Sequence, residues 1–300
     1  MRSTFLISIV LAAALVSAAS LSVANEQCNL KPVGKLNGLR MWSYGTGVAF
    51  LTPALQVDAD GAPDSYRVDG KGLSYTCDGV VAKDDNGRRV TPKSDPKHWQ
   101  QRCQDAWSKA VATDDYSKVA IFGFLTDVNT GKPLVQKAGD PIPGADYLTS
   151  TSVEIPGVRG MEQRRWIDAA QIPYVVLPPN FVRKFAVNGA LALVYRPKTD
   201  TIAFAVYGDG GDFGEGSVKL HNLLGNDPIV IRGGVRRAKQ SIDDAVVTLV
   251  LPINDTKVES DIRSWTERIE SEGKKAVDDL GGQDAVRSCL RRLTGSPQLN

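Results

Sequence analysis

Continuous apolar runs separated by turns rich in Gly, Pro and Asp recur along the chain and predict a sheet. The expected strands are residues 119–128, 172–177, 191–195, 202–207 and 245–251, and residues 48–57 form a further apolar run that ends at an acidic loop. Two of them, 191–195 and 202–207, flank the turn Pro197-Lys198-Thr199-Asp200 and should pair across it. Residues 25–45 show no such pattern and are expected to be irregular. The pattern predicts a mainly β (α+β) fold with helices at its periphery.

Apolar residues at helical spacing predict the helices. Asp95 and Pro96 have the residue types of a helix start, and Ser217 can cap a short helix that ends at Gly225. The tail contains one apolar stripe over 262–280, interrupted by Gly273, and a second helix from 284 to about 293. One face of the first helix carries Trp99, Cys103, Ala106, Trp107 and Ala110. Its tryptophans are therefore expected in the core and not as sugar platforms.

The N-terminus has the features of a secretory signal peptide. Arg2 precedes an apolar run, and small residues end at Ala24, so residues 1–24 are predicted to be removed. An uncleaved membrane anchor is the alternative. The remaining 25–300 contain no obvious linker and are expected to form one secreted or periplasmic domain, without a membrane partner after cleavage. With a net charge of +2 and no dense Lys/Arg stripe, a nucleic-acid partner is disfavoured.

Four cysteines follow the predicted signal peptide, and an even number in an oxidising compartment predicts two disulfides. Three connectivities are possible for Cys28, Cys77, Cys103 and Cys289. The favoured pairs are Cys77 with Cys103, which closes a local loop, and Cys28 with Cys289, which joins the termini. A metal site is disfavoured because the cysteines are dispersed and the sequence has only 2 histidines. No metal or cofactor is expected.

Candidate chemistry lies in residues 207–217, where five glycines surround three carboxylates directly after an apolar run. Asp209 and Glu215 are too far apart on a straight strand to act together, at roughly 20 Å. Glycosidases need two carboxyls within about 5–9.5 Å. The glycines make a tight reversal feasible, which would bring the pair together. A solvated hairpin whose acids only face water is the alternative.

Other sites are weaker on residue types alone. A calcium loop at Asp58, Asp60, Asp64 and Asp69 is conceivable, but Ala62 and Pro63 do not fit the EF-hand pattern. His221 lies in an apolar helix and is expected to be structural. The basic run 232–237 is expected to be a solvated turn, with anion binding as the alternative. The sequence contains neither a Gly-x-Ser-x-Gly nor a His-Glu-x-x-His motif.

Several blocks, in order, resemble the fungal-type chitosanases of glycoside hydrolase family 75. They are 57–63, 139–144 with 150–152, 172–178, 206–209 and 214–217. The last two correspond to the segment that bears the family's essential Asp and Glu. The sequence departs from the family at Gly210-Gly211-Asp212, where fungal members tend to have a longer loop.

The resemblance implies a β-barrel-like core and endo-acting hydrolysis of β-1,4 linkages in chitosan with inversion. Glu215 is then expected as general acid and Asp209 as general base. Asp58, Asp60, Asp140 and Asp212 are expected to bind the amino-sugar polymer. Two alternatives remain: action on peptidoglycan glycan or another amino sugar, and a secreted amino-sugar-binding protein without turnover.

Overall fold

The computed structural model describes residues 28–187, 189–251 and 257–295. The predicted signal peptide lies outside these residues. Helices make up 25% and strands 29% of the structure, so the fold is mixed α/β with one large sheet. Strands exceed helices only slightly, and the expectation of a mainly β chain was too strong. The two long C-terminal helices supply much of the helical content.

The large sheet has nine strands in the order β1-β2-β3-β13-β8-β9-β7-β10-β4. They are β1 (Lys31–Leu36), β2 (Leu39–Tyr44), β3 (Gly47–Thr52), β4 (Gln56–Asp58), β7 (Tyr174–Leu177), β8 (Leu191–Arg196), β9 (Thr201–Gly210), β10 (Glu215–Ser217) and β13 (Val246–Leu251). Most neighbours are antiparallel, but β7–β9 and β4–β10 are parallel. Every residue of β7, β8 and β13 is buried, which explains why these strands are continuously apolar.

Two predicted segments differ from the structure. Residues 25–45 include a β-hairpin, β1–β2, which turns at Asn37 and Gly38 with φ angles of 47° and 84°. The expected strand 119–128 is only β6 (Val119–Ile121), paired with β5 (Val80–Ala82). Beyond β6 the chain leaves that pairing, although Thr126 and Pro133 form an isolated bridge around the turn at 129–131.

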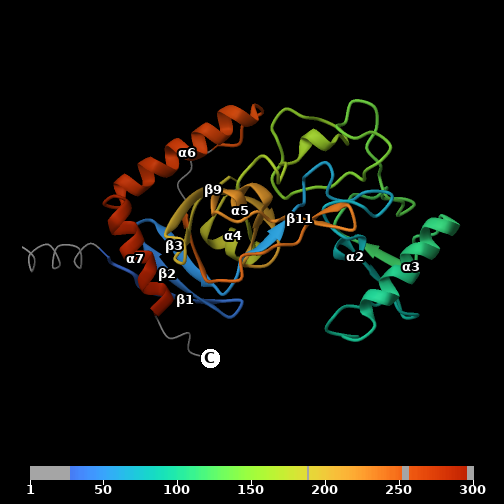
Figure 1. Ribbon diagram of the computed structural model, residues 1–300, viewed down its shortest axis with the longest axis horizontal. Helices are drawn as coiled ribbons and strands as arrows, with labels where there is room; N and C mark the ends of the chain where they lie inside the picture. Colours follow the sequence, from blue (N-terminus) through green and yellow to red (C-terminus); the bar gives the residue numbers. More distant parts are fainter. Residues whose placement is uncertain (1–27, 188, 252–256, 296–300) are drawn as a thin grey trace, which may run out of the picture.

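The predicted tail helices are confirmed as α6 (Ile262–Asp279) and α7 (Gln283–Gly295), which lie together at one end of the molecule (Figure 1). Gly273 interrupts the stripe of α6 for a physical reason. A Cβ there would lie 2.2 Å from Cγ of Phe204, so only glycine lets α6 approach β9 this closely. The short helices α4 (Pro179–Phe185) and α5 (Val218–Leu223) are also present. Ser217 caps α5 as predicted, because its side chain accepts a hydrogen bond from the Leu220 amide.

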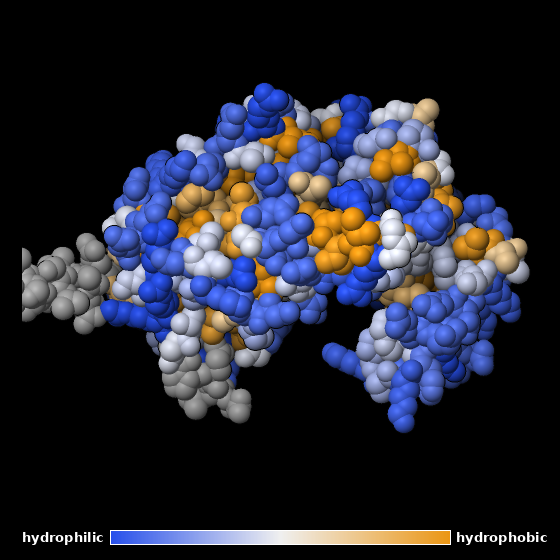
Figure 2. Space-filling view, viewed as in Figure 1, coloured by the Kyte–Doolittle hydropathy of each residue, from blue (hydrophilic) through white to orange (hydrophobic). Residues whose placement is uncertain are grey.

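At the other end, a lobe contains α2 (Thr76–Gly79), β5, β6 and α3 (Trp99–Thr113) (Figure 1). It has its own small apolar cluster, in which Trp107 packs edge-on against Phe124 and Tyr147. Trp107 is half-buried and packs against this cluster, so the expectation of a core tryptophan holds in part. Figure 2 shows that much of the lobe's visible surface is hydrophilic and that an indentation separates its lower part from the main body.

Both disulfides have the favoured connectivity. Cys77 pairs with Cys103 inside the lobe, and Cys28 pairs with Cys289 of α7. The described residues thus form two apolar clusters, and a single domain over 25–300 stays a prediction. None of the helices in the described ranges is long and apolar enough to cross a membrane.

Candidate active site

A β-bulge in β9 determines where Asp209 points. β9 runs parallel to β7, with Tyr207 opposite Val175 and Asp209 opposite Val176. Gly208 is therefore an extra residue in the ladder. In a regular ladder Gly208 would stand opposite Val176, and the alternation of side chains would place Asp209 on the same face as Tyr207 and Val175. The bulge instead puts Asp209 on the face shared by Tyr174 and Val176.

Only glycine fits at the bulge. A Cβ on Gly208 would lie 2.5 Å from Cβ and 2.6 Å from Cγ of Tyr174. Tyr174 is itself fully buried and cannot move aside freely. The glycine after the apolar run is thus explained by a close approach between two strands, and not by a turn.

Glu215 reaches the same face from the opposite side of β7. β10 is antiparallel to β7 with Gly216 opposite Val175, so Glu215 stands opposite Val176. Asp209, Val176 and Glu215 therefore form one row across three strands. Two strand spacings separate the two acids, roughly 10 Å between backbones. This spacing is closer to the carboxyl separation of inverting glycosidases than to that of retaining ones.

The acids are not brought together by a tight reversal, as the glycines had suggested. Residues 211–214 cross over the end of β7, and the Gly211 amide donates to the Leu177 carbonyl at 3.3 Å. Gly214 alone among the glycines of this crossing has a positive φ, 89°. The pair is therefore assembled by β7, which lies between its members.

Asp58 and Asp60 lie beside this row. β4 runs parallel to β10 with Asp58 opposite Ser217, which places Asp58 on the face of Glu215. The Asp60 amide donates to Oδ1 of Asp58 at 2.8 Å, and the Tyr174 hydroxyl donates to the Asp60 carbonyl at 2.9 Å. We call Asp58, Asp60, Asp209 and Glu215 the acidic cluster.

Burial and mutual repulsion raise the pKa values of the acidic cluster. Burial, followed by the charges of Asp58, Asp212 and Asp209, raises the pKa of Glu215 to about 7. Burial and the charge of Asp209 raise the pKa of Asp58 to about 7. The pKa of Asp60 is also raised well above its usual range, by burial and then by the charges of its acidic neighbours. The cluster therefore retains protons near neutral pH, and its titrations are coupled.

Asp209 is the most firmly oriented member. Its Oδ1 accepts hydrogen bonds from the Ser152 amide at 2.8 Å, the Ser152 hydroxyl at 2.8 Å and the Gly210 amide at 2.7 Å. Burial raises the pKa of Asp209, while these hydrogen bonds act in the opposite direction. A carboxylate fixed by three donors is suited to the role of a base, while a protonated Glu215 is suited to that of an acid.

The acidic cluster lacks a basic partner within the described part of the chain. No Lys, Arg or His is among the main groups that shift the pKa values of its four carboxyls. The described residues also contain no group of three or more His, Cys, Asp or Glu arranged to hold a metal ion. Among the described residues, the negative charge of the cluster is thus limited by retained protons and not by a basic side chain.

The other predicted binding residues lie differently. Asp212 is exposed and acts on Glu215 through its charge. Asp140 is buried, and its two oxygens accept hydrogen bonds from the amides of Lys137 and Gln163. The Gln163 side chain in turn donates to the Gly61 carbonyl at 3.0 Å. Asp140 thereby supports the loop next to Asp60, and nothing in these contacts places it against a ligand.

The residues of the alternative calcium and histidine sites lie away from the acidic cluster or are buried. Asp64 and Asp69 pair with Arg236 and Arg67, at 3.4 and 3.1 Å, apart from Asp58 and Asp60. Their arginine partners oppose a calcium loop. His221 is buried, and burial lowers its pKa to about 4, as expected for a structural histidine.

The basic run 232–237 forms the hairpin of β11 (Ile229–Arg232) and β12 (Val235–Ala238). It is only partly a solvated turn. Arg237 is buried, and its guanidinium donates to the carbonyls of Gly70, Gly72 and Ser74. This arginine therefore fixes a neighbouring loop, which neither expectation for the run had included.

Three supporting residues were missed in the sequence. They are Ser152, which orients Asp209, Tyr174, whose hydroxyl donates to the Asp60 carbonyl, and Tyr66, whose pKa is raised by burial and then by the charges of Asp60 and Asp58. Tyr174 lies in a continuous apolar run, where nothing local marks its hydroxyl. Tyr66 lies just after the acidic loop, and a buried tyrosine beside acids is a usable signal because its hydroxyl needs a partner.

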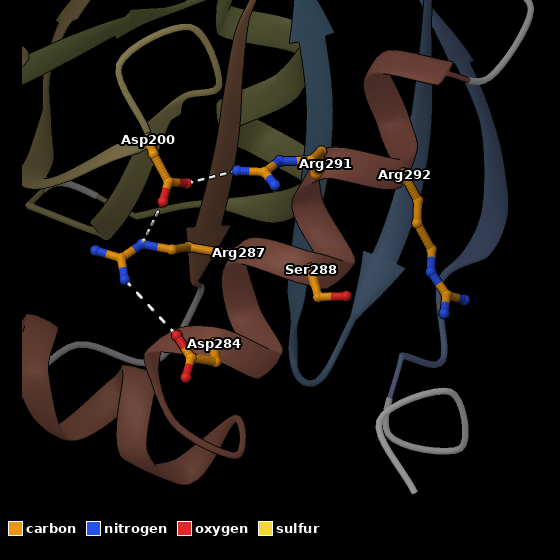
Figure 3. A pocket seen from close by; sticks show the side chains of 6 residues that line it. All are labelled: Asp200, Asp284, Arg287, Ser288, Arg291 and Arg292. Atoms are coloured by element: carbon orange, nitrogen blue, oxygen red, sulfur yellow. Dashed lines mark hydrogen bonds and ion pairs between the residues drawn. The ribbon is translucent and has the colours of Figure 1, made fainter. Parts of the chain in front are cut away.

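A second charged cluster lies around α7, at the turn between β8 and β9 (Figure 3). It lines a pocket of about 380 Å³. Asp200 accepts a hydrogen bond from Arg291 at 2.7 Å and lies 3.9 Å from Arg287, which in turn lies 3.8 Å from Asp284. We call Asp200, Asp284, Arg287 and Arg291 the α7 ion network. Its acids and arginines alternate, so its charges are balanced within the protein.

Comparison of the chain with models of known protein families found no match, and comparison with curated proteins found no significant similarity.

Proposed function

We propose that this protein is a secreted or periplasmic glycoside hydrolase that cleaves β-1,4 linkages in chitosan or a related amino-sugar polymer. The observation that carries the proposal is the acidic cluster, whose four carboxyls share one sheet region without a basic partner. A polymer of glucosamine carries ammonium groups, which would supply the missing positive charge through charge-assisted hydrogen bonds. The resemblance of the sequence blocks to chitosanases points to the same substrate class.

In the proposed mechanism Glu215 donates a proton to the leaving glycosidic oxygen, and Asp209 removes a proton from the attacking water. A pKa of Glu215 of about 7 keeps part of the population protonated at neutral pH, as a general acid requires. The spacing across β7 leaves room for a water between Asp209 and the sugar, which favours inversion. Asp58 and Asp60 bind the ammonium groups of the bound sugars.

The same proposal includes a barrel-like curvature of the sheet. Only residues 53–55 separate β3 from β4, yet these strands pair with opposite parts of the sheet order. Leu55 also exchanges two backbone hydrogen bonds of 2.9 Å with Ile242. The described strands do not close into a ring. Curvature of this kind would bring Asp58 toward Asp209 across the concave face.

Release of reducing ends from purified chitosan, chitin and peptidoglycan tests the proposal. We expect hydrolysis of chitosan with a bell-shaped pH–rate profile, since an acid and a base must both be in the correct state. NMR of the first product should show the inverted anomer. Cleavage of peptidoglycan alone would change the substrate. Binding of glucosamine oligomers without cleavage of any polymer would identify a binding protein.

A further inference from the structure

One aromatic ring is exposed in the lobe that contains β5 and β6. Phe122 directly follows β6, and its side chain is 53% exposed. Within the described ranges, every other Phe, Tyr and Trp is buried or half-buried. An apolar ring held in solvent is therefore unusual for this molecule and needs a physical explanation.

The backbone at Phe122 is held firmly next to the loop that carries Asp60. The amides of Phe122 and Gly123 both donate to the Gly79 carbonyl, at 2.9 and 3.0 Å. The Gly123 carbonyl accepts from the Thr149 hydroxyl at 3.0 Å, and the same hydroxyl accepts from the Gly61 amide at 3.3 Å. One threonine thus joins the residue after Phe122 to the residue after Asp60.

A second contact connects the same two segments. A Cβ on Gly123 would lie 2.5 Å from the Tyr66 hydroxyl, so the chain passes directly against this tyrosine. Tyr66 lies close enough to Asp60 that the charge of this carboxyl, after burial, raises the pKa of the tyrosine hydroxyl. Phe122 is therefore held a short distance from Asp60, within the length of a ligand of a few sugar units.

The ring of Phe122 already has a cation on its face. The Arg89 guanidinium carbon lies 5.7 Å from the ring centroid, and both residues are exposed. Aromatic faces attract cations, and desolvation by a bound ligand strengthens the attraction. A glucosamine unit offers both an apolar C–H face and an ammonium group, and this ammonium group would take the place of the exposed Arg89 guanidinium on the ring.

We propose that Phe122 forms a remote subsite for one amino-sugar unit of the polymer, with the sugar stacked on its ring. This inference rests on the proposed function, because the acidic cluster binds the neighbouring units. The occupant is a glucosamine unit of the same chain that reaches Asp60. Phe122 determines how long a substrate must be to bind well, and takes no part in proton transfer.

The test measures binding by titration calorimetry in the Glu215→Gln background, which prevents turnover. The probes are the glucosamine dimer and hexamer and the N-acetylglucosamine hexamer. We expect Phe122→Ala to lower the affinity for the glucosamine hexamer by about two- to fivefold, the range for an exposed cation–π contact. The same variant should change the affinity for the dimer little. It should lower the affinity for the acetylated hexamer less than the affinity for the glucosamine hexamer. Phe122→Trp should retain hexamer affinity, and Ile231→Ala, which removes another exposed apolar side chain, should change nothing.

If Phe122→Ala and its parent bind the hexamer with equal affinity, the subsite is wrong. The subsite is also wrong if the variant loses as much affinity for the dimer as for the hexamer. If the native protein hydrolyses chitosan while Phe122→Ala binds normally, only this inference fails. If the hexamer binds through Phe122 but no polymer is cleaved, the proposed hydrolysis fails and the subsite stands. If the parent binds no glucosamine oligomer at all, both fail.

Discussion

The acidic cluster and the α7 ion network contain charged residues in opposite arrangements. In the α7 ion network each carboxylate faces an arginine, and the pKa of Arg291 is raised by Tyr195 and Asp200. In the acidic cluster four carboxyls face one another, and the pKa of every one is raised. The first arrangement holds a helix to a turn. The mutual repulsion of the four carboxyls in the acidic cluster lowers the stability of the protein without a ligand. Clusters of this kind occur more often at functional sites than at structural ones.

The largest effect is expected from neutralising the proposed acid or base. Glu215→Gln and Asp209→Asn should each lower chitosan hydrolysis by at least ~10²-fold, the lower end of what a positioned acid or base contributes. Both variants should fold, as judged by circular dichroism. Asp284→Asn in the α7 ion network is the matched control and should keep full activity. Full activity of either cluster variant would remove that residue from the mechanism.

The second-largest effect is expected from a substitution at the β-bulge of β9. Gly208→Ala should push Tyr174 and β9 apart, since its Cβ would lie 2.5 Å from Cβ of Tyr174. We expect a destabilisation of about 1–3 kcal/mol from overpacking. We also expect a loss of kcat on the order of 10²-fold, because Asp209 is misplaced. Gly295→Ala, in open space at the end of α7, is the control for both measurements. A variant that unfolds more easily but keeps native kcat below its melting temperature would show that the bulge does not position the base.

The pH dependence of stability should separate the two regions. The pKa of Asp58 is about 7 in the folded protein, against 3.8 for an ordinary aspartate. Between about pH 4 and 7 the folded state therefore binds more protons than the unfolded chain, and the free energy of unfolding falls as pH rises. Asp58→Asn removes this loss, so the variant should be more stable than the native protein at pH 8 and similar to it at pH 4.

Denaturant titrations of both proteins at several pH values measure this difference. Comparing the variant with its parent cancels the opposite contribution of His221, whose lowered pKa makes stability rise between about pH 4 and 6.5. Asp200→Asn is the control from the α7 ion network and should lower stability at pH 8. A less stable Asp58→Asn at pH 8 would mean that hydrogen bonding outweighs repulsion at this residue.

The smallest effect is expected within the α7 ion network itself. Asp200 and Arg291 are both about half exposed, so their coupling in a double-mutant cycle should be about 1 kcal/mol or less. The cycle uses Asp200→Asn and Arg291→Gln, with unfolding in urea as the readout. Hydrolysis should be unchanged in all four proteins. A change in activity would mean that this region also contacts substrate.

Local patterns predicted the elements whose causes are local. The tail helices follow from the stripe of α6, and β8–β9 follows from two apolar runs across one short turn. The hairpin β1–β2 was missed although its signal is present, since Asn37-Gly38 is a preferred pair for a tight two-residue turn. The expected strand 119–128 ends early, because from Gly123 onward the chain hydrogen-bonds Gly79, Thr149 and Leu148 and leaves β5.

The sequence predicted which acidic residues form the candidate site, but not how the strands bring them together. The glycine-rich surroundings of Asp209 and Glu215 predict them as a pair, but nothing near them in the sequence shows that β7 lies between them. The strand that separates the acids precedes Asp209 by more than thirty residues. Its register, and the flip that Gly208 introduces, depend on Tyr174 and Val176. Long-range pairing of this kind leaves no local pattern to interpret.

The bond between Cys28 and Cys289 has a consequence for the order of events in biosynthesis. Its cysteines are 261 residues apart, whereas those of the lobe are 26 apart. During vectorial synthesis the lobe can oxidise as soon as Cys103 emerges. Cys28, among the first described residues to emerge, must wait for almost the whole chain. If the chain is made into an oxidising compartment, the Cys28 thiol thus stays without its native partner until α7 arrives.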